Sequence, residues 1–347
     1  MRRRLALILM GVLLLALLAT GAAAAAPART CTFTPRLVTI LSWGDGGSFA
    51  ESMAADSHGC LFVSLTKWAD SNSGEIWRVL PHGNKTLAAT MDLGPYGMLA
   101  GVAVDRCDRV YVVNWDSAYT YGEQPTLGSG VWRVGPGRSL TKVLELPDGT
   151  FPNGLAFHDG FAYVTGSTAG TIWRARVRGD ALMPAVEWAR DPLLAPANPQ
   201  NSIGANGMAF RGDTLFVSVS EQGRIVRIPV RRDGSPGAAR VICERPELAT
   251  ADGIACDAFG GIWITVNSGS TGASPSGALY RLSCTASLQK IADDPGWLNY
   301  PVMPVFGTTP STAGTLFVLN GAFGGWDDGT SPDIQALRVG VPGLPLR

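Results

Sequence analysis

The sequence predicts an all-β protein, a six-bladed β-propeller with four-stranded antiparallel blades, because two patterns each occur six times in the same register. The first is an aromatic residue inside a short β-branched run, centred on Phe62, Tyr111, Tyr163, Phe216, Trp263 and Phe317. The second follows each of these, usually as an apolar pair and an arginine, at Arg78, Arg133, Arg174, Arg227, Arg281 and Arg338. The aromatics are 49, 52, 53, 47 and 54 residues apart, and a period near 50 is typical of radial arrays of small sheets.

Each repeat is expected to form one blade, with its innermost strand first in the chain. In the third repeat the four strands are NGLAF from Asn153, AYVT around Tyr163, TIWRA ending at Ala175 and AVEWA from Ala185. The connections are mostly short and rich in Gly, Pro, Ser and Asp, which predicts few helices. The sixth repeat has no obvious strand after Arg338, whereas the run RLVTIL, residues 36–41, precedes the first repeat. We predict that this N-terminal strand closes the sixth blade and removes an open edge.

The repeated aromatics and arginines have structural explanations. The aromatics are predicted to lie in the core between blades. An arginine on an exposed strand face, with its stem packed and its head in water, is ordinary, so we assign these arginines no catalytic role. No linker or change of composition divides the chain, which favours a single propeller domain over residues 27–347. We expect a monomer.

Residues 1–26 have the layout of a secretory signal peptide. Arg2–Arg4 are followed by an apolar run, residues 5–18, and then by small residues through Ala26. We therefore expect export, cleavage near Ala26, and a secreted or extracytoplasmic protein with no membrane contact after cleavage. The alternative is an uncleaved anchor, because residues 5–26 carry no charge and are long enough to span a bilayer.

Charge and cysteine content narrow the functional classes. The chain has 28 basic and 28 acidic residues and no basic run beyond its first residues, which argues against nucleic acid as a partner. There is no Cys-x-x-Cys pair, and His58 near Cys60 stands alone, so a zinc or redox site is disfavoured. Disulfides or buried thiols are favoured for the six cysteines, all in the exported part: Cys31, Cys60, Cys107, Cys243, Cys256 and Cys284.

The candidate functional residues stand just before the innermost strand of each blade, at one mouth of the central channel. Counting back from the aromatics places Glu51, Ala100, Asn153, Asn206 and Asp252 there, with no clear equivalent in the sixth blade. Four of these five carry oxygen donors, and a hard divalent cation would relieve the repulsion between the two carboxylates. We therefore predict a Ca²⁺ site. The alternative is that Asn-Gly and Asp-Gly are only turn dipeptides, although this does not account for Glu51.

This pattern resembles that of the senescence-marker-protein (regucalcin), gluconolactonase and diisopropyl-fluorophosphatase superfamily of six-bladed propellers. The resemblance covers nearly the whole exported chain and implies that Glu51, Asn153, Asn206 and Asp252 hold calcium. It also implies hydrolysis of a lactone or related ester as small-molecule substrate, with Asp252 both a ligand and the candidate catalytic base or nucleophile. The chain departs from the family at Ser52 and Met53, where Gly-Pro is usual, and none of its histidines lies at a metal-bearing position.

The ends of the second strands are candidates for the substrate wall, although each of these residues is also explained as an ordinary loop residue. The substrate-binding candidates are Asn114, Trp115, Glu221 and Asn267, and Lys67, Trp68 and Asn320 occupy related positions.

Three functions remain open at this point. The first is an exported calcium-dependent hydrolase of the lactonase or esterase type. The second is a non-catalytic propeller that holds a structural calcium and binds a ligand or protein through its loops, because a fold does not fix a function. The third is a strictosidine-synthase-like enzyme, which would need an acidic base such as Glu221.

Overall fold

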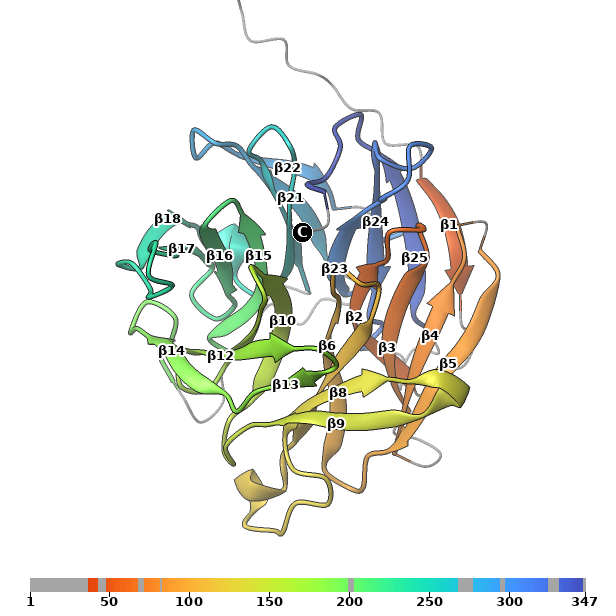
Figure 1. Cartoon of the computed structure of the whole chain (residues 1–347). Helices are drawn as coiled ribbons and strands as arrows, with labels where there is room; N and C mark the ends of the chain where they lie inside the picture. The colour runs from red at the N-terminus through yellow and green to blue at the C-terminus, as the bar shows by residue number, and fades with distance from the viewer. Residues whose placement is uncertain are drawn as a thin grey trace, which may run out of the picture. The chain divides into compact units, whose positions relative to one another are not determined.

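Six small sheets surround a common axis in the compact unit Thr34–Arg347, which confirms the predicted six-bladed propeller (Figure 1). The computed structural model describes residues 37–42, 48–67, 72–81, 83–198, 203–267, 277–293, 297–323 and 331–345. The innermost strands pack one against the next around the axis, and the last contacts the first, so that the ring is complete; they are β2, β6, β10, β15, β19 and β23.

The blades are antiparallel, and each runs outward from the axis in chain order. Blade 1 contains β2 (Ser48–Ala55), β3 (Leu61–Lys67), β4 (Ser73–Val79) and β5 (Lys85–Asp92). Blade 2 contains β6 (Gly97–Val104), β7 (Val110–Asp116), β8 (Gly130–Val134) and β9 (Leu140–Glu145). Blade 3 contains β10 (Pro152–His158), β11 (Phe161–Gly166), β12 (Thr171–Arg178), β13 (Ala181–Leu182) and β14 (Val186–Arg190). Blade 4 contains β15 (Ala205–Arg211), β16 (Thr214–Val219), β17 (Arg224–Pro229) and β18 (Arg240–Glu244). Blade 5 contains β19 (Ala251–Cys256), β20 (Ile262–Val266), β21 (Ala278–Leu282) and β22 (Leu288–Ala292). Blade 6 contains β23 (Pro301–Phe306), β24 (Thr315–Asn320) and β25 (Asp333–Arg338).

The outer edge of blade 6 pairs with the first described strand of the chain. β1 (Leu37–Ser42) runs antiparallel to β25, with Leu37 opposite Leu337 and Ser42 opposite Asp333. In blade 3 the short strand β13 adds to the four strands, and both β13 and β14 pair with β12.

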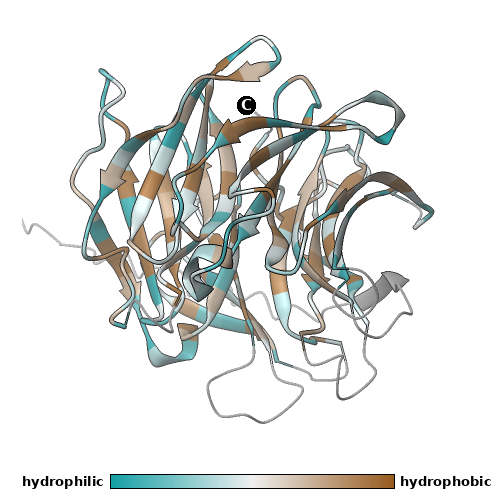
Figure 2. Ribbon diagram, turned by 90° about the horizontal axis from the view of Figure 1, so that it is seen from below, coloured by the Kyte–Doolittle hydropathy of each residue, from teal (hydrophilic) through white to brown (hydrophobic). Residues whose placement is uncertain are grey.

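The core lies between blades and is filled largely by the second strand of each. All six repeated aromatics are buried there, as predicted, and Tyr111 and Trp263 are completely covered. Figure 2 shows apolar residues concentrated within the strands and polar residues at their ends. Helix in the described residues is limited to three short 3₁₀ turns, η1 (Ala118–Tyr121), η2 (Pro136–Arg138) and η3 (Pro246–Leu248), and none is long and apolar enough to cross a membrane. The predicted signal segment, residues 1–26, lies outside the described residues.

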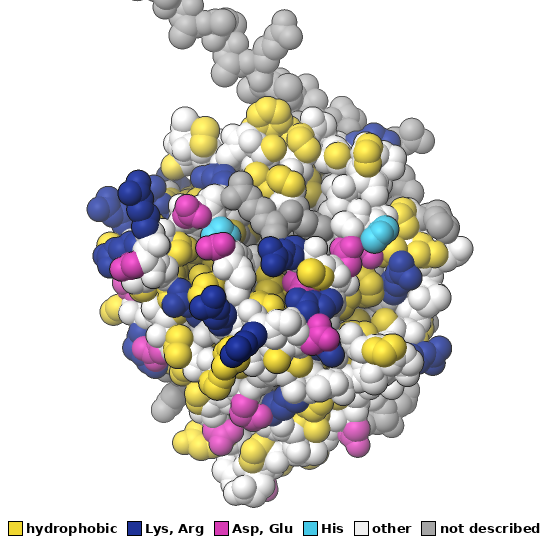
Figure 3. Space-filling view, viewed as in Figure 1, with side chains coloured by type: hydrophobic (Ala, Val, Ile, Leu, Met, Phe, Trp, Pro, Cys, Tyr) yellow, Lys and Arg dark blue, Asp and Glu magenta, His cyan; other side chains and the backbone are white. Residues whose placement is uncertain are grey.

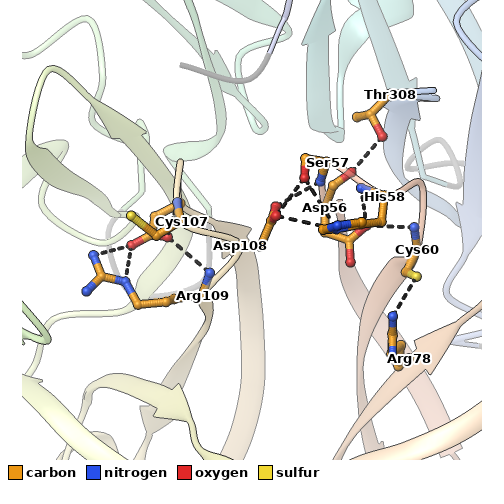
Figure 4. A network of polar contacts seen from close by, with 10 residues as sticks. Asp56, Ser57, His58, Cys60, Arg78, Cys107, Asp108, Arg109 and Thr308 are labelled. Atoms are coloured by element: carbon orange, nitrogen blue, oxygen red, sulfur yellow. Dashed lines mark hydrogen bonds and ion pairs between the residues drawn. The ribbon is translucent and has the colours of Figure 1, made fainter. Parts of the chain in front are cut away.

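The turns between the first and second strands are closed by buried aspartates in three blades. Each carboxylate accepts backbone N–H bonds from the residues two and four positions later; the aspartates are Asp56, Asp105 and Asp257. Figure 4 shows two of these turns side by side, where Asp108 of blade 2 also accepts a hydrogen bond from the Ser57 hydroxyl of blade 1. Figure 3 shows that basic and acidic side chains are intermixed on this face of the molecule.

The repeated arginines do more than the sequence suggests, because two of them, Arg281 and Arg78, contact these turns. Arg281 donates through Nε to Asp257 Oδ2 at 2.9 Å, and the Trp263 indole donates to the same oxygen at 3.0 Å. Burial alone would raise the pKa of Asp257, but the bonds from Gly261, Arg281 and Trp263 outweigh it and lower that pKa. Arg78 similarly donates to the Cys60 thiol at 3.1 Å.

The predicted disulfides are not found among the described cysteines, which is a correction. Cys60, Cys243 and Cys256 are buried free thiols, and Cys107 and Cys284 are exposed free thiols. The buried thiols pack as small apolar groups within the core clusters, which satisfies them without a bridge. Cys31 lies outside the described residues.

Replacing Asp257 with Asn tests the importance of these turns. The Asp257 side chain is fully buried beside Arg281, so removing its charge should lower the free energy of unfolding by about 3 kcal/mol. Because the pKa of Asp257 is lowered in the folded state, its contribution is complete above the ordinary Asp pKa of about 4 and is lost as pH falls below it. Urea unfolding at pH 7 and at pH 3 should therefore show a difference from wild type that shrinks in acid.

Asp213→Asn is the matched control for this experiment. The Asp213 side chain is 82% exposed and faces His158 Nε2 at 3.4 Å, so its replacement should change stability by no more than about 1 kcal/mol. If both variants were equally stable, the buried turn would contribute nothing particular to the fold.

Candidate metal centre

Each innermost strand has a β-bulge at the same position, near its start. The register shifts between Ala50 and Ser52, Leu99 and Val102, Pro152 and Leu155, Ala205 and Met208, Ala251 and Ile254, and Pro301 and Met303. The candidate residues Glu51, Ala100, Asn153, Asn206 and Asp252 occupy these bulges, so they lie within the strands and not in front of them. A bulge bends its strand and changes the direction of its side chain, which explains how these residues leave the sheet for the axis.

Glycine follows the candidate position in four of the blades because the neighbouring backbone comes too close for a side chain. A Cβ on Gly207 would lie 2.4 Å from the Asp252 carbonyl oxygen, and one on Gly154 would lie 2.5 Å from the Asn206 carbonyl oxygen. The same close approach occurs at Gly101 and Gly253. The Asn-Gly and Asp-Gly pairs are therefore not hairpin turns, and the turn-dipeptide interpretation is wrong.

Hydroxyl groups from the second strands fix this close packing. Thr165 Oγ1 donates to the Asn206 carbonyl at 2.8 Å, and Ser218 Oγ donates to the Asp252 carbonyl at 2.5 Å. Ser64 and Thr265 make the corresponding bonds to Ala100 and Val302. Each hydroxyl thus links one blade to the bulge of the next, and the candidate residues are held by their backbones.

The structure brings the four predicted metal ligands together around one small cavity. A cavity of about 20 Å³ is lined by Glu51, Asn153, Asn206 and Asp252, together with Val302 and backbone of the bulges. A space of this size holds roughly one water molecule or one ion. Val302 is the blade 6 equivalent that the sequence did not reveal, because the register there depends on the bulge.

The cavity contains polar atoms that have no hydrogen-bond partner. Asn153, Asn206 and Asp252 are at least 96% buried, whereas Glu51 keeps partial exposure. Asp252 Oδ2 and Asn153 Nδ2 are buried without a partner, and the Oδ1 atom of Asn267, which lies beside Asp252 outside the cavity lining, is also unpartnered. Buried polar groups are nearly always paired, so an unpartnered carboxylate oxygen points to something that binds there.

Burial makes the two carboxylates difficult to ionise together. Burial and then the charge of Asp252 raise the pKa of Glu51 well above its ordinary value. Burial also raises the pKa of Asp252 to about 7, although the Asn267 and Asn206 side chains partly offset this effect. Both shifts have the sign expected where negative charge lacks a compensating cation.

The residues present fit a divalent cation that prefers oxygen. The set has two carboxylates and two amide side chains in a space for one ion, and Ca²⁺ accepts mixed carboxylate and carbonyl oxygen ligands. Among the described residues, no three His, Cys, Asp or Glu side chains lie close enough together to hold a metal ion. The amide side chains of Asn153 and Asn206 are therefore needed to complete the ligand set.

The second strands end at the same mouth as the candidate centre, because their last residues pair with the first residues of the innermost strands. Asn114 lies opposite Leu99, and Asn320 lies opposite Pro301. Asn267 follows β20 and lies beside Asp252. This orientation could not be decided from the sequence.

The substrate-wall candidates differ in their surroundings. Glu221 is exposed and accepts the backbone N–H of Ala197 at 2.6 Å, so it holds a loop. Asn114 donates to the Gly128 carbonyl, and Asn320 donates to Asp333 and to the Trp297 carbonyl. Lys67 pairs with Glu75, whereas Trp115 stacks on Phe151 with ring centroids 3.8 Å apart. Trp68 lies outside the described residues.

Fold and site together define a six-bladed propeller with an acidic and amide-lined cavity where its innermost strands meet. No family model and no curated protein matches the sequence. Among solved structures, the chain is similar to a calcium-binding protein, regucalcin, from Agrobacterium tumefaciens, with 19% identity, a TM-score of 0.61, and coverage of 91% of this chain and 98% of that one. It is also similar to a luciferin-regenerating enzyme, with 12% identity, a TM-score of 0.62, and coverage of 90% and 98%.

Virginiamycin B lyase from Staphylococcus aureus shares the architecture at 14% identity, with a TM-score of 0.52 and coverage of 88% of this chain and 99% of that one. At these identities the similarities show the fold. They confirm that the chain shares the six-bladed propeller fold of regucalcin and the luciferin-regenerating enzyme, which is the fold that the sequence resemblance implied.

Gly207→Ala tests the packing that positions the centre. Its Cβ would lie 2.4 Å from a neighbouring backbone oxygen that cannot move freely, so we expect a loss of about 2 kcal/mol in the free energy of unfolding. Gly314→Ala is the control, because its Cβ would make contacts of 3.7 Å or more. Equal stability of the two variants in urea unfolding would show that the bulges are not closely packed.

Proposed function

We propose that this protein is an exported calcium-dependent hydrolase of the lactonase or esterase type, with its metal held by Glu51, Asn153, Asn206 and Asp252. The observation that carries the proposal is the unpartnered, buried Asp252 oxygen in a cavity that also receives Glu51 and two amides. Two carboxylates in so small and so buried a space are costly unless a cation accompanies them. The similarity in fold to a calcium-binding regucalcin supports the same choice of ion.

The chemistry follows from the position of the centre at the mouth where the second strands end. A bound Ca²⁺ would supply Lewis-acid polarisation of a substrate carbonyl. Asp252 is the carboxylate best placed to take a proton or to attack, because Asn206 and Asn267 flank it and the hydroxyl of Ser218 fixes its backbone. Trp115, one residue before the end of β7, would orient the substrate at this mouth, whereas Asn114 is completely buried and bonded to the Gly128 carbonyl.

A histidine-dependent lyase is less well supported. A variant of the Staphylococcus aureus lyase with one histidine replaced by alanine is catalytically inactive. Among the described histidines of this chain, neither His58 nor His158 lines the candidate cavity, and both follow or end innermost strands at the opposite face. A strictosidine-synthase-like reaction based on Glu221 is also disfavoured, because that carboxylate is engaged with the backbone of Ala197.

Calorimetric titration of the chelator-stripped protein tests the metal. Wild type should bind Ca²⁺ at one site, and Asp252→Asn should weaken binding at least about 100-fold, because it removes one of the two charges in the cavity. Asn153→Ala should weaken binding less, because it removes a neutral ligand. Glu187→Gln, which alters an exposed carboxylate on the outer strand β14, should bind as wild type does.

Turnover separates the hydrolase from a non-catalytic propeller that uses calcium structurally. A panel of aliphatic and aromatic lactones and esters should be hydrolysed by the calcium-loaded protein and not after chelation. Binding of calcium without turnover of any ester would favour the ligand-binding alternative. A folded wild type that binds no calcium would contradict the proposal.

A further inference from the structure

The loop between β7 and β8 is a rigidly organised segment at the same mouth as the candidate centre. The buried Asp116 carboxylate accepts the backbone N–H of Thr126 at 2.8 Å and of Leu127 at 3.0 Å, and further N–H bonds come from Ala118 and Gly128. One side chain thus gathers both ends of the loop. These four hydrogen bonds, which we call the Asp116 knot, fix the conformation of the short 3₁₀ turn η1, which lies between the two ends of the loop.

A second contact ties this loop to the turn before β6. Ser117 donates to the Tyr96 carbonyl at 2.9 Å through its hydroxyl and also through its backbone N–H. The Tyr96 ring stacks on the Tyr121 ring, with centroids 5.4 Å apart and an interplanar angle of 26°. The Tyr96 and Tyr121 rings therefore cover one face of each other, and the hydrogen bonds of Ser117 hold the turn that carries Tyr96 against this loop.

Two aromatic rings on this loop are exposed although the backbone beneath them is well held. Tyr119 is 63% exposed and Tyr121 is 68% exposed. Large side chains that stay exposed on an ordered segment are a common feature of binding surfaces, because rigid aromatics lose little conformational entropy on contact with a ligand. We call Tyr96, Tyr119 and Tyr121 the tyrosine ledge.

Aromatic contacts connect the ledge to the candidate centre along the chain that leads to Asn153. Gly149 lies against the Tyr119 ring, since a Cβ there would be 3.2 Å from it. Two residues later Phe151 stacks on Trp115 at 3.8 Å, and two residues after that comes Asn153 in the cavity. Four residues span at most about 14 Å, so the backbone beside the ledge lies within about that distance of Asn153.

The blade that carries the ledge contributes no polar ligand to the cavity, because Ala100 occupies its bulge. Blade 2 therefore offers aromatic surface where blades 1, 3, 4 and 5 offer oxygen atoms. We infer that the tyrosine ledge binds a flat aromatic ring of the substrate whose ester or lactone group reaches the candidate centre. That this ligand is a substrate rests on the proposed function, whereas the affinity of the ledge for an aromatic ring does not depend on it.

The test uses probes that cannot be hydrolysed, so that binding is measured apart from turnover. A benzo-fused δ-lactam and its ring-saturated analogue are titrated into the calcium-loaded and into the chelator-treated full-length protein by calorimetry. Wild type should prefer the aromatic lactam about five-fold, the gain expected from ring stacking beyond burial. Tyr121→Ala and Tyr119→Ala should each reduce this preference to about two-fold or less.

Two further variants keep the result specific. Tyr121→Phe retains a ring and should keep the preference. Phe259→Ala removes another exposed aromatic, 67% exposed, from the turn between β19 and β20 at the opposite face, and should also keep it. All four substitutions are at the surface, so folding should be unaffected.

Equal affinity of wild type for the two lactams, or an unchanged preference in both alanine variants, would overturn the inference. Analytical ultracentrifugation tests whether a second copy of the chain occupies the ledge instead. If wild type were a dimer and Tyr121→Ala a monomer, the ledge would be an interface between copies, and the inference would be overturned. Failure of every ester and lactone to turn over would refute the proposed hydrolase and leave the lactam measurement to be judged separately.

Discussion

The innermost strands approach one another so closely at their bulges that the backbone carbonyl of one blade lies against the Cα of a glycine in the blade before it. This contact leaves no room for a Cβ at Gly154 or Gly207, and a hydroxyl from the second strand donates to the same carbonyl. The ring of blades therefore closes around backbone atoms and not around side chains. Because backbone positions are fixed in this way, the side chains carried by the bulges reach the axis with little freedom.

The energetic cost of this rigid arrangement is the burial of two carboxyl groups in the cavity. Asp252 and Glu51 are held near each other in a space of about 20 Å³, and both have raised pKa values because of burial and, for Glu51, the neighbouring charge. A core built only for stability would place apolar residues there, as blades 2 and 6 do with Ala100 and Val302. Buried carboxyl groups with raised pKa values and an unpartnered oxygen are typical of a functional site.

Much of the fold could be predicted from the sequence, because two markers recur together at a period typical of a radial array. The positions of Glu51, Asn153, Asn206 and Asp252 relative to the aromatics also place them at equivalent points of their blades. The sequence could not show that these positions are bulges, because a bulge depends on pairing with a neighbouring strand. For that reason Asn-Gly looked like a possible turn, and Val302 in blade 6 had no recognisable signal.

Other features depended on contacts between distant segments. The repeated Arg281 appears on its strand as a solvent-facing residue, and only the fold brings it to Asp257. Glu221 appears free in a loop, yet it accepts the N–H of Ala197. The cysteines suggested disulfides because of the expected export, whereas the described ones are free thiols, several packed in the core. The loop that carries Tyr119 and Tyr121 is long and polar in the sequence, but only the fold shows that Asp116 holds this loop and that both rings are exposed.

A crystal structure of the calcium-loaded protein would test the central claim most directly, namely that four bulges on different blades converge on one cation. The account predicts a single calcium peak with side-chain oxygens of Glu51, Asn153, Asn206 and Asp252 at about 2.3–2.6 Å. Density for water in that cavity at saturating calcium, or a calcium ion bound elsewhere on the propeller, would contradict it.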